Sequence, residues 1–139
     1  MRQNYFRPVI LGFSFFAPAS LLMSTLTFPV LASQYFENPT LEAENGNSYK
    51  ISICVHSYRF PTQEDKCSKT AASLAANKFC QAKGYLGWEY YRTEDIGWKN
   101  RITAFWWTEK YIKGDLNKGF LTAPNTSGLF SLIVCNQKK

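Results

Sequence analysis

The sequence contains a single histidine, His56, among its 139 residues. Mechanisms that need two imidazoles are therefore excluded for this chain. The phosphate-binding glycine loop, the nucleophile elbow and the zinc-binding helix motif, which mark several large enzyme classes, are also missing. Four cysteines are present, but no two of them form a CxxC pair. With one imidazole and no close pair of thiols, the sequence predicts neither a metal site nor a cofactor.

Acidic residues are scarce as well, ten against sixteen lysines and arginines, which gives a formal net charge of +6. The imbalance lies late in the chain, because residues 66–139 hold five acids and twelve bases. A basic region favours nucleic acid, anionic glycans, phosphate or an anionic membrane surface, although scattered lysines also serve simply to keep an exported domain soluble. No specific nucleic-acid motif accompanies the charge. The predicted partner is a glycan or polyanion, with a protein partner as the alternative.

Charge is absent altogether from residues 8–32, after Arg2 and Arg7. A basic start, an apolar run and the small residues Val30 and Ala32 are typical of a secretory signal cleaved after Ala32. We therefore predict a signal peptide at residues 1–32 and a secreted or periplasmic mature chain without a stable membrane span. The alternative is a membrane anchor, because an uncleaved run of about 25 residues is long enough to cross a bilayer.

A helix is predicted between residues 62 and 84. Thr62 is placed to cap it, acids follow in the first turn, and Gly84 suits the left-handed conformation that ends helices. At about 100° per residue one stripe is apolar and mostly small. Its members are Ala72, Ala75, Ala76 and Phe79. The small side chains allow this helix to approach a sheet closely.

The four cysteines all follow the signal, and an even number in a short exported chain predicts two disulfides. If Cys67 and Cys80 are both helical, they lie roughly 20 Å apart and cannot pair with each other. Two connectivities then remain. We favour Cys54 with Cys67 and Cys80 with Cys135, because the first pair flanks a short strand-to-helix connection.

Alternating apolar and polar residues predict strands at 49–56, 88–92, 101–108 and 129–135, with a brief edge strand at 120–122. Residues 33–48 are polar and turn-rich, so we expect an arm there and a packed domain over 49–139. The fold class predicted is α+β, with one helix packed on a small antiparallel sheet of about four strands and two disulfides.

An aromatic and basic region runs from residue 88 to residue 107. Flat rings stack on sugars or bases, and neighbouring cations hold anionic groups. The candidate ligand-binding residues are Trp88, Trp98, Arg101, Trp106 and Trp107. Core packing is the competing interpretation, because a small domain needs large side chains. Alternation along the strand predicts that Trp106 or Trp107 is exposed, but not both.

His56 is the only candidate catalytic residue. With a carboxylate and an arginine beside it, it would supply the proton transfers of a small ribonuclease-like hydrolase. A lone histidine on a strand is more often a polar surface residue or a hydrogen-bonded one. The leading hypothesis is therefore a secreted, non-enzymatic binding module for a glycan or anionic partner. The alternatives are a hydrolase that uses His56 and a protein-binding inhibitor domain.

Overall fold

The computed structural model describes residues 32–137. The predicted signal peptide therefore lies outside the described residues, except for Ala32. Residues 32–137 form an α+β domain with one long helix, a seven-stranded sheet and two disulfides. Within this range no helix is long and apolar enough to span a bilayer.

The segment predicted as a polar arm is instead part of the sheet. β1 (Gln34–Glu37) pairs antiparallel with β7 (Gly128–Cys135), and β2 (Thr40–Glu42) pairs antiparallel with β3 (Ser48–Ser57). Phe36 anchors β1, because its ring meets that of Phe79 edge-on at 5.2 Å. These strands are short, and each has only one partly buried residue among exposed ones. The sequence pattern therefore did not indicate a strand. The domain begins at β1 rather than at residue 49.

The predicted helix is interrupted near its start. α2 (Gln63–Lys66) is one turn long, and α3 (Lys69–Ala82) follows. Thr62 caps α2 as expected, since its Oγ1 accepts the Asp65 N–H at 3.0 Å. The prediction missed a second cap at Ser68, whose Oγ accepts the Ala71 N–H at 3.2 Å. Ser68 therefore starts a new helix and leaves Cys67 at the break.

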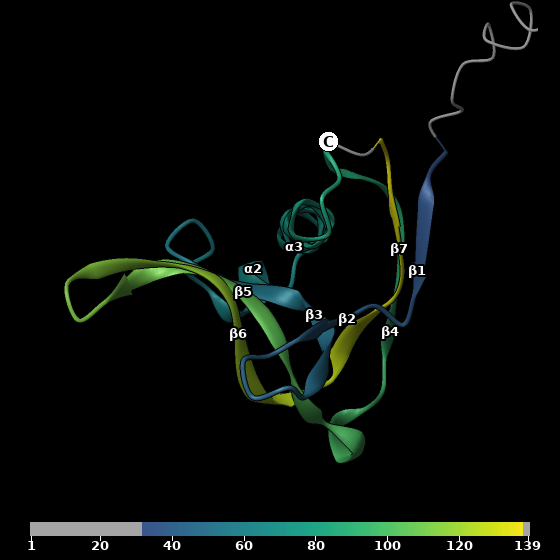
Figure 1. Cartoon of the computed structure of the whole chain (residues 1–139). Helices are drawn as coiled ribbons and strands as arrows, with labels where there is room; N and C mark the ends of the chain where they lie inside the picture. Colours follow the sequence, from purple (N-terminus) through teal and green to yellow (C-terminus); the bar gives the residue numbers. More distant parts are fainter. Residues whose placement is uncertain (1–31, 138–139) are drawn as a thin grey trace, which may run out of the picture. The chain divides into compact units, whose positions relative to one another are not determined.

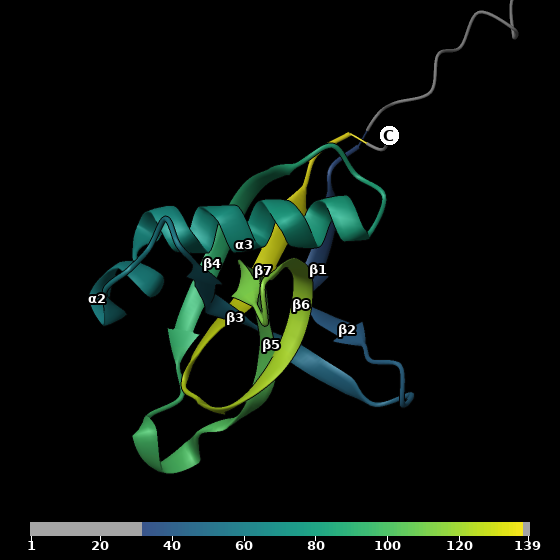
Figure 2. The same ribbon diagram turned by 90° about the vertical axis from the view of Figure 1, so that its left-hand side faces the viewer.

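α3 packs on the sheet through the stripe predicted for it. Its buried residues are Ala71, Ala72, Ala75, Ala76, Phe79 and Cys80. Gly84, with φ +92°, follows the helix in the left-handed conformation, which only glycine adopts without strain. Figure 1 looks down α3, which lies in the concave angle of the sheet, and Figure 2 shows it crossing the strands. The helix and this face of the sheet share one core.

The remaining strands are β4 (Trp88–Asp95), β5 (Ile102–Ile112) and β6 (Asp115–Thr126). The sheet order is β1-β7-β3-β5-β6, with β2 added on β3 and β4 on β7. The prediction of about four antiparallel strands was therefore wrong in the number of strands. It was also wrong in direction, since β3 and β5 run parallel. A parallel neighbour needs a long crossover, which α3 and β4 supply here.

Both disulfides join the pairs favoured from the sequence. Cys54 bonds to Cys67 and ties β3 to the break between the helices. Cys80 bonds to Cys135 and ties the last turn of α3 to the end of β7. Each helix is therefore held covalently to a strand that it packs against.

β5 and β6 form a hairpin that extends beyond the strands predicted for this region (Figure 1). Lys113 and Gly114 make the two-residue turn at its tip, with φ +56° and +90°. Positive φ at both positions is the mark of a type I′ turn, which matches the twist of a hairpin. Residues 110–118 are all exposed. The outer half of the hairpin therefore projects from the core.

Candidate functional site

Trp98 is held out in solvent on a short turn between β4 and β5. It begins the 3-10 helix η3 (Trp98–Asn100), and its side chain is 69% exposed. Asp95 Oδ1 accepts the Gly97 N–H at 2.9 Å, and Asn100 Nδ2 donates to the Ile96 carbonyl at 2.9 Å. Gly97 has φ +87°, which favours glycine at this position. These contacts give the exposed indole a defined support.

Two cations lie close to the indole of Trp98. Lys99 Nζ lies 5.9 Å and Arg101 Cζ 5.8 Å from a Trp98 ring centroid, within the range of cation–π attraction. Arg101 Nε also donates to the Trp98 carbonyl at 2.7 Å, which fixes its guanidinium beside the ring. Trp98 and Arg101 of the predicted site therefore lie together. Lys99, between them in sequence, joins them. We name these three residues the Trp98 turn.

The other three predicted tryptophans contribute to packing. Trp88 is half-buried, with its ring 5.0 Å from that of Tyr91. Trp107 packs against the core beneath Lys78, whose Nζ lies 5.0 Å from a Trp107 ring centroid. Trp106 donates its indole N–H to Thr126 Oγ1 at 2.7 Å. Trp106 and Trp107 are both half-buried, so neither is the freely exposed ring that alternation predicted.

The four tryptophans do not all lie on one surface. Trp106 and Trp107 are successive residues of β5 and point to opposite faces of the sheet. Trp88 begins β4, whereas Trp98 comes ten residues later, beyond the far end of that strand. The aromatic and basic residues of region 88–107 are close in sequence, but they do not form one cluster in space.

His56 lines a groove of about 330 Å³ at the end of β3. The remaining lining residues are Ser57, Tyr58, Phe60, Pro61, Lys66, Lys110 and Tyr111. The imidazole stacks on the Trp106 ring, with centroids 4.4 Å apart and 20° between planes. Its Nδ1 is buried without a hydrogen-bond partner. Burial first, and then the charges of Lys110 and Lys66, hold the pKa of His56 below its ordinary value of 6.5.

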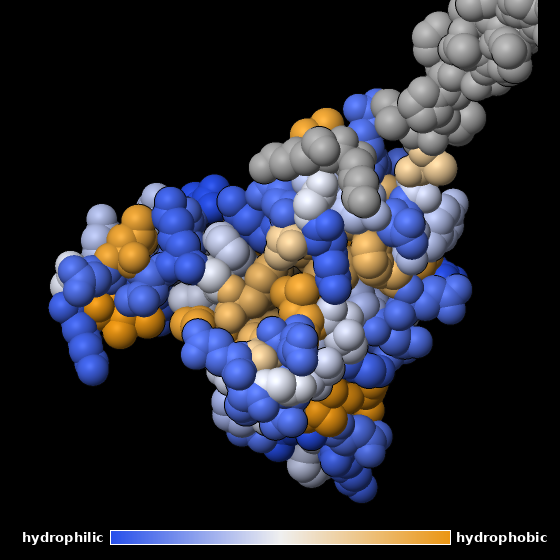
Figure 3. Space-filling view, in the orientation of Figure 1, coloured by the Kyte–Doolittle hydropathy of each residue, from blue (hydrophilic) through white to orange (hydrophobic). Residues whose placement is uncertain are grey.

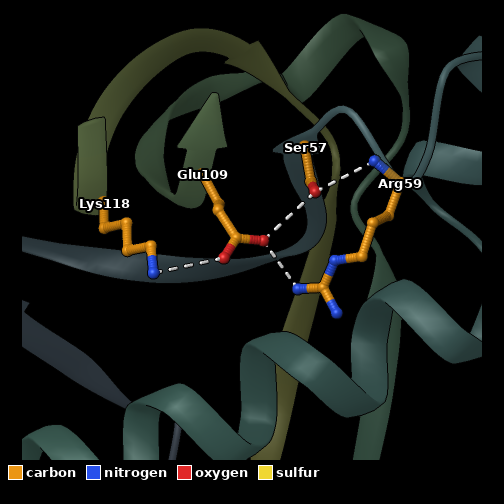
Figure 4. A network of polar contacts seen from close by, with 4 residues as sticks. All are labelled: Ser57, Arg59, Glu109 and Lys118. Atoms are coloured by element: carbon orange, nitrogen blue, oxygen red, sulfur yellow. Dashed lines mark hydrogen bonds and ion pairs between the residues drawn. The ribbon is translucent and has the colours of Figure 1, made fainter. Parts of the chain in front are cut away.

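Glu109 is the centre of a polar network on the other face of the sheet (Figure 4). Arg59 Nη2 donates to Glu109 Oε1 at 2.7 Å, and Lys118 Nζ lies 3.7 Å from Oε2. Ser57 Oγ donates to Oε1 at 3.4 Å and accepts the Arg59 N–H at 3.2 Å. Burial raises the pKa of Glu109, but the Arg59 hydrogen bond and charge, Lys118 and Ser57 outweigh it, so this pKa lies below its ordinary value.

The acid–base arrangement required for a hydrolase at His56 is not assembled. In the β3–β5 register His56 lies opposite Thr108, and Ser57 lies opposite Glu109. Neighbours along a strand face opposite ways, so Glu109 and Arg59 point away from the imidazole. Within residues 32–137 no carboxylate reaches ion-pair distance of His56. The lining of the groove therefore combines His56 with two lysines and, among the described residues, no acid.

A second groove, of about 450 Å³, has a partly apolar lining. Leu41, Ala43, Phe105, Phe120 and Leu121 contribute apolar atoms, and Glu42, Glu44 and Thr122 complete the lining. Figure 3 shows hydrophobic residues gathered on this face of the domain between α3 and β6.

Sequence reasoning missed the lysines of the His56 groove. Lys110 lies beyond residue 108, where β5 was expected to stop, and Lys66 ends the unexpected first helix.

In the part of the chain that the structure describes, no three His, Cys, Asp or Glu side chains gather in a way that could hold a metal ion.

Searches of protein-family models, curated proteins and solved structures gave no match to this chain.

Proposed function

We propose that this protein is a non-enzymatic binding module that holds an anionic glycan on the Trp98 turn. The observation that carries the proposal is the 69% exposure of Trp98 on a hydrogen-bonded turn, with two cations close to its ring. An indole face stacks on the C–H face of a sugar, and a guanidinium binds sulfate or carboxylate groups with paired hydrogen bonds. The turn offers both chemistries within one saccharide's reach.

The energetics favour a preformed site. When a ligand covers a large apolar ring that was exposed to water, the free energy of the system falls. A turn that is already ordered also loses little entropy on binding. The Trp98 turn meets both conditions, because its hydrogen bonds form without a ligand. The two disulfides agree with export to an oxidising compartment, where extracellular glycans are found.

The proposal predicts that Trp98→Ala weakens binding of a heparin-derived tetrasaccharide about tenfold, a loss of about 1.4 kcal/mol. Trp98→Phe keeps a flat ring and retains most of the affinity. Isothermal titration calorimetry on the disulfide-bonded protein measures both variants. Lys113→Gln is the matched control for charge, since Lys113 is an exposed cation at the distant hairpin tip.

The contribution of the cations is separated by salt. Replacing Lys99 and Arg101 with glutamine lowers the salt dependence of binding, because fewer counterions are released, while Lys113→Gln leaves it unchanged. Equal losses in Trp98→Ala and Lys113→Gln would show that the protein binds only as a general polycation. Unchanged affinity in Trp98→Ala would refute the proposal.

A further inference from the structure

We propose that the His56 groove is a second binding site, for a single tetrahedral oxyanion of the sulfate or phosphate class, and that His56 takes up a proton when the anion binds. This site is separate from the Trp98 turn. Lys110 follows Arg101 by nine residues along β5, or about 30 Å at the rise of an extended strand. An experiment can therefore refute binding at one site without refuting binding at the other.

Charge is the first argument for an anion. Lys66 comes from α2 and Lys110 from β5, so two separate elements direct cations at one groove. No acidic residue is among the groove's lining within the described chain. Glu109, the nearest carboxylate in the strand register, is engaged by Arg59 and Lys118 on the opposite face. The positive charge of the groove is therefore left uncompensated by protein groups.

Hydrogen-bond donors are the second argument. His56 Nδ1 is buried without a partner, and a tautomer with the proton on Nε2 avoids burying an unpaired N–H at this position. Nε2 is then the nitrogen left to donate to a ligand. Stacking on Trp106 at 4.4 Å fixes the plane of the imidazole. Tyr58 and Tyr111, both more than 60% exposed, add hydroxyl donors at the groove's sides.

The groove's volume suits a small ligand group. About 330 Å³ lies at the lower end of the range for small-molecule sites, which is enough for one ionic group and part of the molecule that carries it. A tetrahedral oxyanion presents three or four oxygens out of one plane, whereas the two oxygens of a carboxylate lie in one plane. The groove's polar residues come from α2, β5 and the end of β3, and this spread over separate elements favours the tetrahedral group.

Proton linkage follows from the same arrangement. In the free protein burial, Lys110 and Lys66 oppose the charged form of His56. The groups that face the imidazole are Lys66 from α2, Lys110 and Tyr111 from β5, and Tyr58 after β3. The proton taken up goes to Nδ1, where it forms a buried N–H without a protein partner. A bound anion offsets the charges of Lys66 and Lys110 and attracts the imidazolium, and the proposal requires this attraction to exceed the cost of the unpaired N–H. The affinity for the anion then rises as the pH falls through the histidine range.

The test uses the fact that the protein has one histidine, whose ring gives a single unambiguous set of NMR signals. The His56 ring is titrated with pH by ¹H–¹⁵N correlation spectra of the disulfide-bonded protein in sodium sulfate and in sodium chloride of equal ionic strength. Sulfate is the first probe because it does not itself titrate near neutral pH. We expect its presence to raise the pKa of His56 by about one unit, equivalent to about tenfold tighter binding to the protonated form.

Lysine variants and further ligands test which residues bind the anion and which source of the oxyanion is preferred. Lys66→Gln and Lys110→Gln each weaken sulfate binding several-fold, whereas Lys113→Gln and Trp98→Ala leave the His56 response intact. A phosphomonoester and a monosulfated sugar, compared at equal concentration, identify which source of the oxyanion binds more tightly. The same His56 titration in sulfate and chloride would overturn the proposal, as would equal losses in Lys110→Gln and Lys113→Gln. The wild-type comparison decides even if a lysine variant fails to fold.

Discussion

Neighbouring residues of β3 face different electrostatic surroundings. His56 lines a groove that includes two lysines. Ser57, on the opposite face, contacts the carboxylate of Glu109, which also accepts a hydrogen bond from Arg59. The consequences for protonation are opposite. Among the lysines the neutral form of the imidazole is favoured, and beside Arg59 the charged form of Glu109 is favoured. A shift of one residue along β3 therefore exchanges one environment for the other.

This difference predicts how stability depends on pH. The pKa of His56 in the folded chain lies below the ordinary 6.5, so between these two values the unfolded chain binds a proton that the folded chain does not. The free energy of unfolding is therefore highest above pH 6.5 and falls as the pH is lowered through the histidine range. Glu109 acts in a lower window, because its depressed pKa removes stability only below its ordinary 4.5.

Urea unfolding above and below pH 6.5 measures this effect. His56→Asn loses the stacking on Trp106 and is less stable at both pH values, but it lacks the pH step, since asparagine does not titrate. Glu109→Gln serves as the control and keeps the step, because its own window lies lower. A pH step of the same size in wild type and His56→Asn would contradict the assignment of the titration to His56.

At the scale of elements, the two disulfides close loops of different length. Cys54 and Cys67 are 13 residues apart, and Cys80 and Cys135 are 55 apart. In the chain-entropy account a longer loop restricts the unfolded state more, and this difference corresponds to about 1 kcal/mol. Replacing Cys80 and Cys135 with alanine should therefore cost more stability than replacing Cys54 and Cys67. Denaturant midpoints of the two double variants measure it.

The outcome also depends on where each disulfide lies. Cys80 and Cys135 are both fully buried, so their alanine variants lose packing as well as the cross-link. Cys67 lies half-buried at the break between α2 and α3, where its loss leaves both helix caps in place. A larger cost for the Cys54–Cys67 pair would show that the turn between the helices, rather than α3 on β7, controls stability.

The elements that the sequence predicted best were those with a strong local signal. The alanine stripe, the Thr62 cap and Gly84 located the helix. Cysteine geometry left two connectivities open, and the short connection between Cys54 and Cys67 favoured the one observed. β1 and β2 went unrecognised because each is short and buries little of its own surface. The parallel pairing of β3 with β5 is a long-range contact that no local pattern specifies.

The candidate site shows the same limit. Trp98, Lys99 and Arg101 are close in sequence, so composition located them, but the burial of Trp88, Trp106 and Trp107 depended on the sheet. The His56 groove joins residues from β3, α2 and β5, which are distant in sequence. Its lysines became recognisable as partners of His56 only once the strands were placed.

At the scale of the whole domain, the Trp98 turn and the His56 groove are distinct surfaces joined by β5. The turn offers an exposed ring with two cations near it, and the groove offers two lysines beside a histidine. Both are basic, which agrees with the excess of lysine and arginine in the second half of the chain. If both proposals hold, a sulfated glycan would contact the first surface through its sugar rings and the second through one sulfate.

The most direct test is a residue-by-residue map of binding over the whole domain. Backbone ¹H–¹⁵N spectra are recorded while a heparin-derived tetrasaccharide is added to the disulfide-bonded protein. We predict that the largest saturable shift changes fall on residues 95–101, together with the indole N–H of Trp98. Largest changes around the apolar groove of Leu41, Phe120 and Leu121, with none at Trp98, would contradict a glycan-binding turn and indicate a different recognition surface.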